Sequence, residues 1–244
     1  MSALIQTEGI VVRTIKYGET SVITEVLTRK LGSQSFIMGG VTAGNARSGL
    51  FQIMNQLEVV VYYKENRTLH RIKEARFLKT YQALSFEIHR SAIGIFILEM
   101  VRKCLRGSVQ DEALYQWVKD CLDLADQRTT PLPWLPVYFA LGFTRFLGIQ
   151  PLKCADPDHR VFDLREGLFL NRAPHHPDYL EGAATALLSR VLECEDILEL
   201  AEINSTTRST RKALLASILD YYRMHLDHFQ GLESPQILEE ILTA

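Results

Sequence analysis

Residues 8–40 consist of short runs of β-branched residues, and a turn signal that contains glycine ends each run. The first run covers residues 10–15, the second residues 21–27 and the third residues 33–38. Runs of this length, repeated about every ten residues, predict an antiparallel β-meander. The sequence therefore predicts a small β-domain at the N-terminal end of the chain.

Two further strands are predicted after an intervening loop. Residues 41–51 form the loop, which leads into a short helical turn at residues 48–52. Residues 57–63 are strongly strand-forming, residues 64–67 give a hairpin turn, and residues 68–78 form the returning strand. Three strands, a short helix and two strands are the element order of an OB-fold barrel, whose face and loops bind single-stranded nucleic acid. We expect this domain over residues 1–80.

Residues 81–244 have the periodicity of helices. Apolar residues at three- and four-residue spacing predict about six helices. An irregular insertion at about residues 149–177 contains a hairpin at 161–170, and residues 179–192 are expected to be helical again. The predicted fold class is therefore α+β, with an OB-fold domain followed by a helical domain.

The distribution of charge separates the two parts. Residues 1–80 contain eleven Lys and Arg against six Asp and Glu, whereas residues 81–244 contain sixteen against twenty-three. A basic head on an acidic body is typical of nucleic-acid binding, and chance variation in solvated faces is the alternative. No apolar run reaches the 18 to 20 or so residues of a membrane helix. The first residues do not resemble a signal peptide, and the cysteines form no CxxC pair. A cytoplasmic, nucleoid-associated location is expected.

No enzymatic motif is visible, so the chain is predicted not to be an enzyme and to take no small-molecule substrate. Nucleotide-binding loops, the GxSxG nucleophile motif and the HExxH metal motif are all absent. The residues Cys154, His159, His175 and His176 are of zinc-ligating types, but their spacing fits no standard zinc pattern. We interpret them as part of a polar loop and expect no metal or cofactor.

The segment TEGIVVRTIKYGETSVITEVLTRKLG, residues 7–32, resembles the opening of the bacterial recombination and repair mediator family RecO. Supporting segments follow in the family's order at residues 57–63, 72–75, 97–101, 147–151, 162–169 and 221–226. The resemblance implies binding of single- and double-stranded DNA and annealing of complementary strands. It also implies loading of RecA, together with RecR, onto DNA coated by the single-stranded-DNA-binding protein SSB. The helical body would contact the acidic, apolar C-terminal tail of SSB, and participation of RecF is left open.

Two features depart from the family pattern. Many members carry a zinc site of two CxxC pairs in the region that corresponds to residues 154–176, where this chain has only Cys154. Many also have several basic residues after the third strand, where this chain reads GGVTAGNARS and keeps only Arg47. If the head binds DNA, we expect it to depend more on its strands and hairpin turns than on that loop.

The basic residues of the two parts are the candidate binding residues. In the head, the candidates for DNA are Arg13, Lys16, Arg29, Lys30, Arg47, Lys64, Arg67, Arg71 and Lys73, with Tyr17, Phe36, Tyr62 and Tyr63 as candidates for stacking on bases. In the body, the candidates for the SSB tail are Arg102, Lys103, Arg211, Lys212 and Arg223. Two alternatives are an enzyme acting on nucleic acid and a protein-binding adaptor whose OB-like head does not touch DNA.

Overall fold

The computed structural model describes residues 3–41, 49–105, 107, 110–154, 156, 158–203 and 207–234. The chain divides into two compact units, Met1–Asp126 and Gln127–Ala244. In the first unit, helices α2 (Ile88–Cys104) and α3 (Glu112–Asp126) accompany the β-domain. The expected domain boundary near residue 80 stays a prediction.

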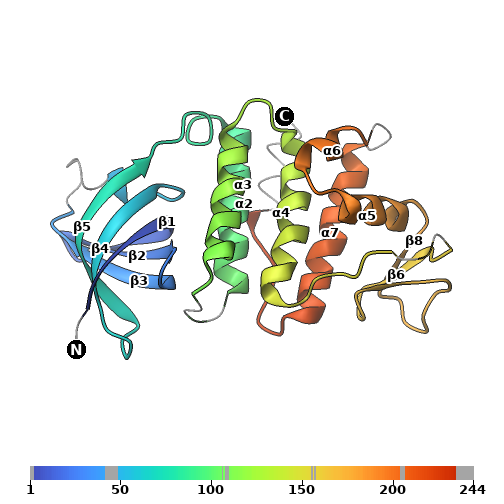
Figure 1. The fold of residues 1–244 in the computed structure, drawn as a ribbon, viewed down its shortest axis with the longest axis horizontal. Coiled ribbons are helices and arrows are strands. Elements are labelled where there is room, and N and C mark those ends of the chain that lie inside the picture. The colour runs from blue at the N-terminus through green and yellow to red at the C-terminus, as the bar shows by residue number, and fades with distance from the viewer. Residues whose placement is uncertain are drawn as a thin grey trace. The chain divides into compact units, whose positions relative to one another are not determined.

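Five strands form the β-domain of the first unit, drawn in blue to teal in Figure 1. They are β1 (Ala3–Tyr17), β2 (Ser21–Thr28), β3 (Gly32–Gly39), β4 (Gln56–Tyr63) and β5 (Leu69–Lys79). They pair in the order β1-β2-β3-β5-β4, and β4 pairs in turn with β1, so that the sheet closes into a barrel. All pairs are antiparallel except the short parallel contact between β3 and β5. The predicted five-stranded OB-fold is confirmed.

Strand β1 closes the barrel because it is long enough to pair with two neighbours. Its first half, Ala3–Ile10, pairs with β4, and the half from Gly9 to Tyr17 pairs with β2. Alternate residues along the strands point inward, so Val11, Phe36 and Val59 are buried in one core. The opposite face is most exposed on β5, where Leu69, Arg71 and Lys73 are exposed. Of the predicted helical turn at residues 48–52, Gly49 and Leu50 are helical, whereas residues 42–48 lie outside the described residues.

Carboxylates at the end of α3 attach this helix to the segment after β5. The side chain of Asp126 accepts hydrogen bonds from three successive backbone N–H groups, those of Gln82, Ala83 and Leu84, at 2.7–3.0 Å. Asp123 accepts hydrogen bonds from the Nζ of Lys79 at 2.8 Å and from the hydroxyl of Tyr81 at 3.1 Å. These bonds fix α3 to the β-domain within one unit.

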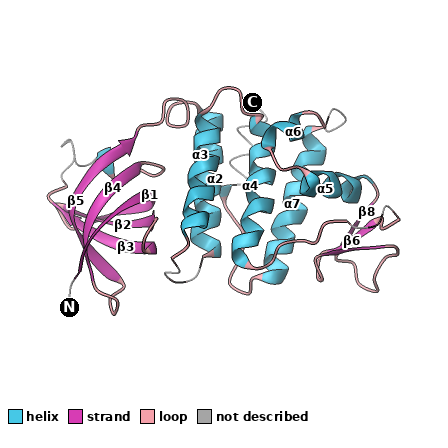
Figure 2. Ribbon diagram, viewed as in Figure 1, coloured by secondary structure: helices cyan, strands magenta, loops and turns pink. Residues whose placement is uncertain are grey.

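The second unit is mostly helical, as the cyan ribbons of Figure 2 show. Its α-helices are α4 (Leu135–Phe143), α5 (Ala183–Glu193), α6 (Ile197–Ala201) and α7 (Arg208–His225), with 3₁₀ turns η1 (Leu132–Trp134) and η2 (Thr144–Leu147) on either side of α4. The hydroxyl of Tyr222 on α7 donates a hydrogen bond to the carbonyl of Ala140 on α4 at 2.7 Å. The predicted helix over residues 134–147 thus corresponds to three consecutive elements, the end of η1, helix α4 and η2.

The predicted hairpin is present, but it belongs to a sheet of three strands. Strand β6 (Val161–Asp163) lies between β7 (Leu168–Leu170) and β8 (Tyr179–Glu181). The expectation that residues 179–181 are helical is wrong, because these residues pair with β6. Gly182, with φ of 63°, ends the strand, and helix α5 begins at the next residue.

Two further expectations are limited by what the structure describes. The predicted closing helix at residues 234–242 lies outside the described residues from residue 235 onward. Within the described part of the chain, no helix combines the length and the apolar character that crossing a membrane requires.

Candidate nucleic-acid interface

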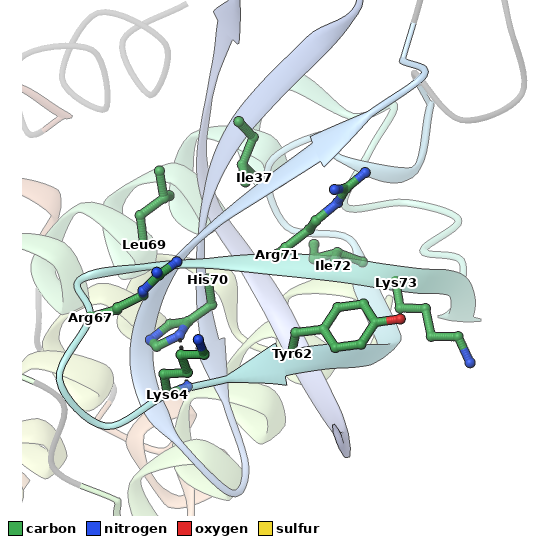
Figure 3. Close-up of a pocket in the computed structure, with 9 residues that line it drawn as sticks. All are labelled: Ile37, Tyr62, Lys64, Arg67, Leu69, His70, Arg71, Ile72 and Lys73. Atoms are coloured by element: carbon green, nitrogen blue, oxygen red, sulfur yellow. Dashed lines mark hydrogen bonds between the residues drawn. The ribbon is translucent and has the colours of Figure 1, made fainter. Parts of the chain in front are cut away.

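A groove of about 750 Å³ lies along the hairpin formed by β4 and β5. Figure 3 shows the residues that line it: Ile37, Tyr62, Lys64, Arg67, Leu69, His70, Arg71, Ile72 and Lys73. Four of them are basic, and none of these lining residues is acidic. The groove thus brings together Lys64, Arg67, Arg71 and Lys73, four of the nine residues predicted to bind DNA.

The local sequence explains this clustering. The backbone N–H of Arg67 donates a hydrogen bond to the carbonyl of Lys64 at 3.1 Å, which closes the turn between the two strands. On β5, Leu69, Arg71 and Lys73 are exposed, while His70 and Ile72 between them are buried. The two-residue period of a strand therefore places Arg71 and Lys73 on the same outer face. Lys73 also lies 3.2 Å from the carboxylate of Glu74.

His70 lies behind the basic residues and supports the turn. Its Nδ1 accepts a hydrogen bond from the backbone N–H of Lys64 at 3.4 Å, and its ring lies against Tyr63 with centroids 4.6 Å apart. Burial and the charge of Arg67 lower the pKa of His70. Its imidazole is therefore neutral near neutral pH, and the positive charge of the groove comes from Lys and Arg alone.

Arg29 and Lys30, the two basic residues of the turn between β2 and β3, are bonded to other groups of the same unit. The Nε of Arg29 donates a hydrogen bond to Glu112 of α3 at 2.7 Å, and its Nη1 lies 3.4 Å from Glu8. The hydrogen bond with Glu112 raises the pKa of Arg29. The Nζ of Lys30 donates to the backbone carbonyl of Gln6 at 2.9 Å. Both residues therefore make contacts inside the unit.

The remaining predicted cations of the head lie elsewhere. Arg13 and Lys16 are exposed on β1, outside the residues that line the groove. Arg47 lies outside the described residues. The prediction that these residues bind DNA stays untested, like that for the groove.

Sequence reasoning missed the apolar residues and the histidine of the groove. Leu69 is 38% exposed and Ile37 is half-buried, although both were taken only as strand residues. The alternation along β5 was a usable signal, since it places Leu69 on the same face as Arg71. The pairing of Ile37 with Arg71 joins β3 to β5 and was not readable from local sequence.

The four candidate stacking residues differ in exposure. Phe36 is fully buried in the core, and Tyr63 is half-buried against His70. Tyr17 is 55% exposed beside the turn between β1 and β2, away from the groove. Tyr62 is 44% exposed and lines the groove. Only Tyr62 therefore combines an exposed ring with the cluster of cations.

The five basic residues predicted to bind the SSB tail do not form one cluster. Arg102 and Lys103 are on α2 of the first unit, and the other three are on α7 of the second. On α7, twelve residues, or about 18 Å of helix, separate Arg211 from Arg223. Lys103 pairs with Glu99 at 3.0 Å, and Arg223 pairs with Asp220.

Arg211 has a different environment from the other four. Its guanidinium lies over the ring of the buried Trp134, 5.6 Å from the ring centre. Burial and the neighbouring charge of Arg208 lower the pKa of Arg211, which still leaves it charged. With Lys212, it lies in the first turns of α7, at the positive end of the helix dipole.

Cys154, His159 and His176, which are of zinc-ligating types, contact different parts of the second unit. Cys154 Sγ lies 3.2 Å from the carbonyl of Asp156, and His159 lies 3.9 Å from the carboxylate of the same residue. His176 instead contacts Asp163 at 3.2 Å. Within the described residues, no group of three or more His, Cys, Asp or Glu is arranged to hold a metal ion. The expectation that the chain binds no metal stays a prediction.

Comparison with known proteins covers nearly the whole chain. The family model described as recombination protein O N terminal matches residues 1–81, and the model described as recombination protein O C terminal matches residues 85–233. The DNA repair protein RecO of Christiangramia forsetii is 30% identical, and the match covers 98% of this chain and 99% of the relative. The proteins of the same name from Phocaeicola vulgatus and Bacteroides fragilis are 26% and 28% identical, over 98% and 97% of this chain and 99% and 98% of their own lengths.

Proposed function

Because the chain belongs to the recombination protein O family and so has a role in DNA repair, we propose that it is a recombination mediator that binds DNA directly. It binds single- and double-stranded DNA and anneals complementary strands. With RecR, it helps to load RecA onto single-stranded DNA coated by SSB. The observation that carries this proposal is the groove of the β4–β5 hairpin, which gathers four cations without an acidic lining residue. The family is one of recombination mediators and is not a known enzyme family.

Annealing requires that the charges of two phosphate backbones be neutralised while the base edges stay free to pair. Lys64, Arg67, Arg71 and Lys73 are exposed, and their long side chains reach phosphates without any requirement for a particular base. Each phosphate contact releases condensed counterions, so binding weakens as salt increases.

The test is annealing of two complementary oligonucleotides, with and without SSB, together with DNA binding measured at increasing salt. We expect faster annealing than in buffer alone and a linear loss of log affinity with log salt. A protein-binding adaptor with an OB-like head would not accelerate annealing and would show no salt-dependent binding of DNA. That result would reject the proposal and favour the adaptor.

The proposal for SSB is that its acidic, apolar C-terminal tail binds basic residues of the helices. The arrangement at Arg211 supports α7, because Arg211 and Lys212 lie near the positive end of the helix dipole, which suits an acidic peptide, and Arg211 lies over the ring of Trp134.

A charge-reversal scan of Arg102, Lys103, Arg211, Lys212 and Arg223 against a labelled SSB-tail peptide tests this. We expect the largest loss of binding for Arg211→Glu and Lys212→Glu and smaller losses for Lys103→Glu and Arg223→Glu. If no variant changes peptide binding, the tail contact is not at these residues.

The mediator activity itself needs a separate assay. RecA loading onto SSB-coated DNA is followed with the chain alone, with RecR, and with RecR and RecF. We expect loading to depend on both the chain and RecR. Comparison of the reactions with and without RecF shows whether RecF takes part in loading. RecA loading that is independent of the chain would reject the mediator role.

A further inference from the structure

The outer face of the barrel carries a row of side chains that crosses the groove. Leu4 of β1 is paired with Tyr62 of β4, Tyr62 is paired with Arg71 of β5, and Arg71 is paired with Ile37 of β3. Residues directly opposite one another on paired strands point to the same face of the sheet. Leu4 is 55% exposed and Tyr62 is 44% exposed. An aromatic ring and aliphatic side chains therefore stand beside Arg71 on one surface.

The same face continues along β5. Leu69, Arg71 and Lys73 succeed one another at every second residue, which spaces them about 7 Å apart in a regular strand, and the β4–β5 register shifts at Lys73, which has no partner on β4. Two cations at such a spacing suit neighbouring phosphates of an extended strand. The apolar atoms beside them would gain from covering the flat face of a base.

A duplex cannot use both parts of this surface. Its bases are stacked on one another inside the helix, so it presents phosphates to Arg71 and Lys73 but no free base face to Tyr62. An unpaired strand presents both, and stacking of a base on an aromatic ring contributes about 1–3 kcal/mol. The arrangement therefore favours single strands over duplexes by more than charge alone.

We infer that the groove is a single-strand subsite, in which Tyr62 stacks on one unpaired base while Arg71 and Lys73 hold the flanking phosphates. The inference rests on the proposed DNA binding and makes Tyr62 the residue that distinguishes single strands from duplexes. Tyr62 is well placed for this role, because β4 pairs with β1 on one side and with β5 on the other. At the tip of the hairpin, the hydrogen bond of His70 to the backbone of Lys64 holds the turn.

The test measures binding of the full chain to a labelled oligothymidylate and to a blunt duplex of equal length. Tyr62→Ala should weaken single-strand binding about tenfold and leave duplex binding nearly unchanged. Tyr62→Phe, which keeps the ring, should bind both as the unsubstituted chain does. Phe77→Ala is the matched control, because it removes an aromatic side chain of β5 that is 47% exposed, close to the 44% of Tyr62, and that does not line the groove.

An abasic oligonucleotide, which has the phosphates but no bases, gives a second measurement. The unsubstituted chain should bind it more weakly than oligothymidylate, and Tyr62→Ala should bind it no more weakly than the unsubstituted chain does. Equal losses for Tyr62→Ala on single strands and duplexes, or the same single-strand loss for Phe77→Ala, would overturn the single-strand subsite alone. If the unsubstituted chain binds none of the three DNAs, the proposed DNA binding fails together with the subsite.

Discussion

The β4–β5 hairpin and the turn between β2 and β3 carry similar basic residues in different surroundings. On β5 of the hairpin, Arg71 and Lys73 line a groove that has no acidic lining residue, although Lys73 also pairs with the neighbouring Glu74 at 3.2 Å. At the other turn, Arg29 is bonded to Glu112 of α3 and lies near Glu8, while Lys30 is bonded to the carbonyl of Gln6. The hairpin therefore has basic side chains along an open groove, whereas the turn between β2 and β3 has them bonded to other parts of the unit. A basic residue on a turn does not by itself indicate which use applies.

The largest effect is expected on stability, when the bonds that attach α3 to the β-domain are removed. Asp126→Ala removes the acceptor of three backbone hydrogen bonds, and we expect the free energy of unfolding to fall by about 3 kcal/mol. Urea denaturation measures it from the shift in midpoint. Asp120→Ala is the control, since Asp120 is an exposed carboxylate of the same helix and should change stability by less than about 0.5 kcal/mol. Equal effects for the two would mean that the attachment contributes little.

The next effect is on DNA binding through the hairpin. The double substitution Arg71→Ala and Lys73→Ala removes two phosphate contacts, and affinity at low salt should fall at least about tenfold. The slope of log affinity against log salt should become shallower by about 1.4 for single strands and about 1.8 for duplexes. Titrations at several salt concentrations give both quantities. An unchanged slope would place the phosphate contacts elsewhere on the chain.

The sequence predicted the strands better than it predicted the use of their side chains. Strand runs and turns are local signals, and all five strands of the β-domain were found from them. Strand β8 was missed because its partner β6 is distant in sequence and its residues run directly into a helix. Glu112, the partner of Arg29, is 83 residues away, so that contact was unreadable. Alternation predicts that Tyr62 and Tyr63 face opposite sides of the sheet, but the fold decides which one faces out.

A third and smaller effect concerns pH. Burial and the charge of Arg67 lower the pKa of His70 in the folded chain, while an unfolded histidine has a pKa of about 6.5. The unfolded chain therefore binds more protons as the pH falls through about 6.5, so stability decreases with decreasing pH over that range. His70→Phe keeps an aromatic ring and should remove this part of the pH dependence. His89→Gln, at an exposed position, should leave it in place.

Urea denaturation at about pH 8, 6.5 and 5 measures the difference between these variants. The comparison uses the change in stability with pH for each variant, because His70→Phe also removes the acceptor for the backbone N–H of Lys64 at every pH. If His70→Phe and the unsubstituted chain lose stability in parallel, His70 is not responsible for the loss.

The smallest effect on DNA binding is expected at the turn between β2 and β3. Arg29→Ala with Lys30→Ala removes the same charge as the double substitution at the hairpin. Affinity for DNA should nevertheless change by less than about twofold, because we expect both side chains to keep their bonds within the unit and so to contribute no phosphate contact. The two double variants are compared in the same titration and at the same salt concentration. Equal losses for the two double variants would mean that DNA displaces Glu112 from Arg29. The difference in use between the β2–β3 turn and the β4–β5 hairpin would then be rejected.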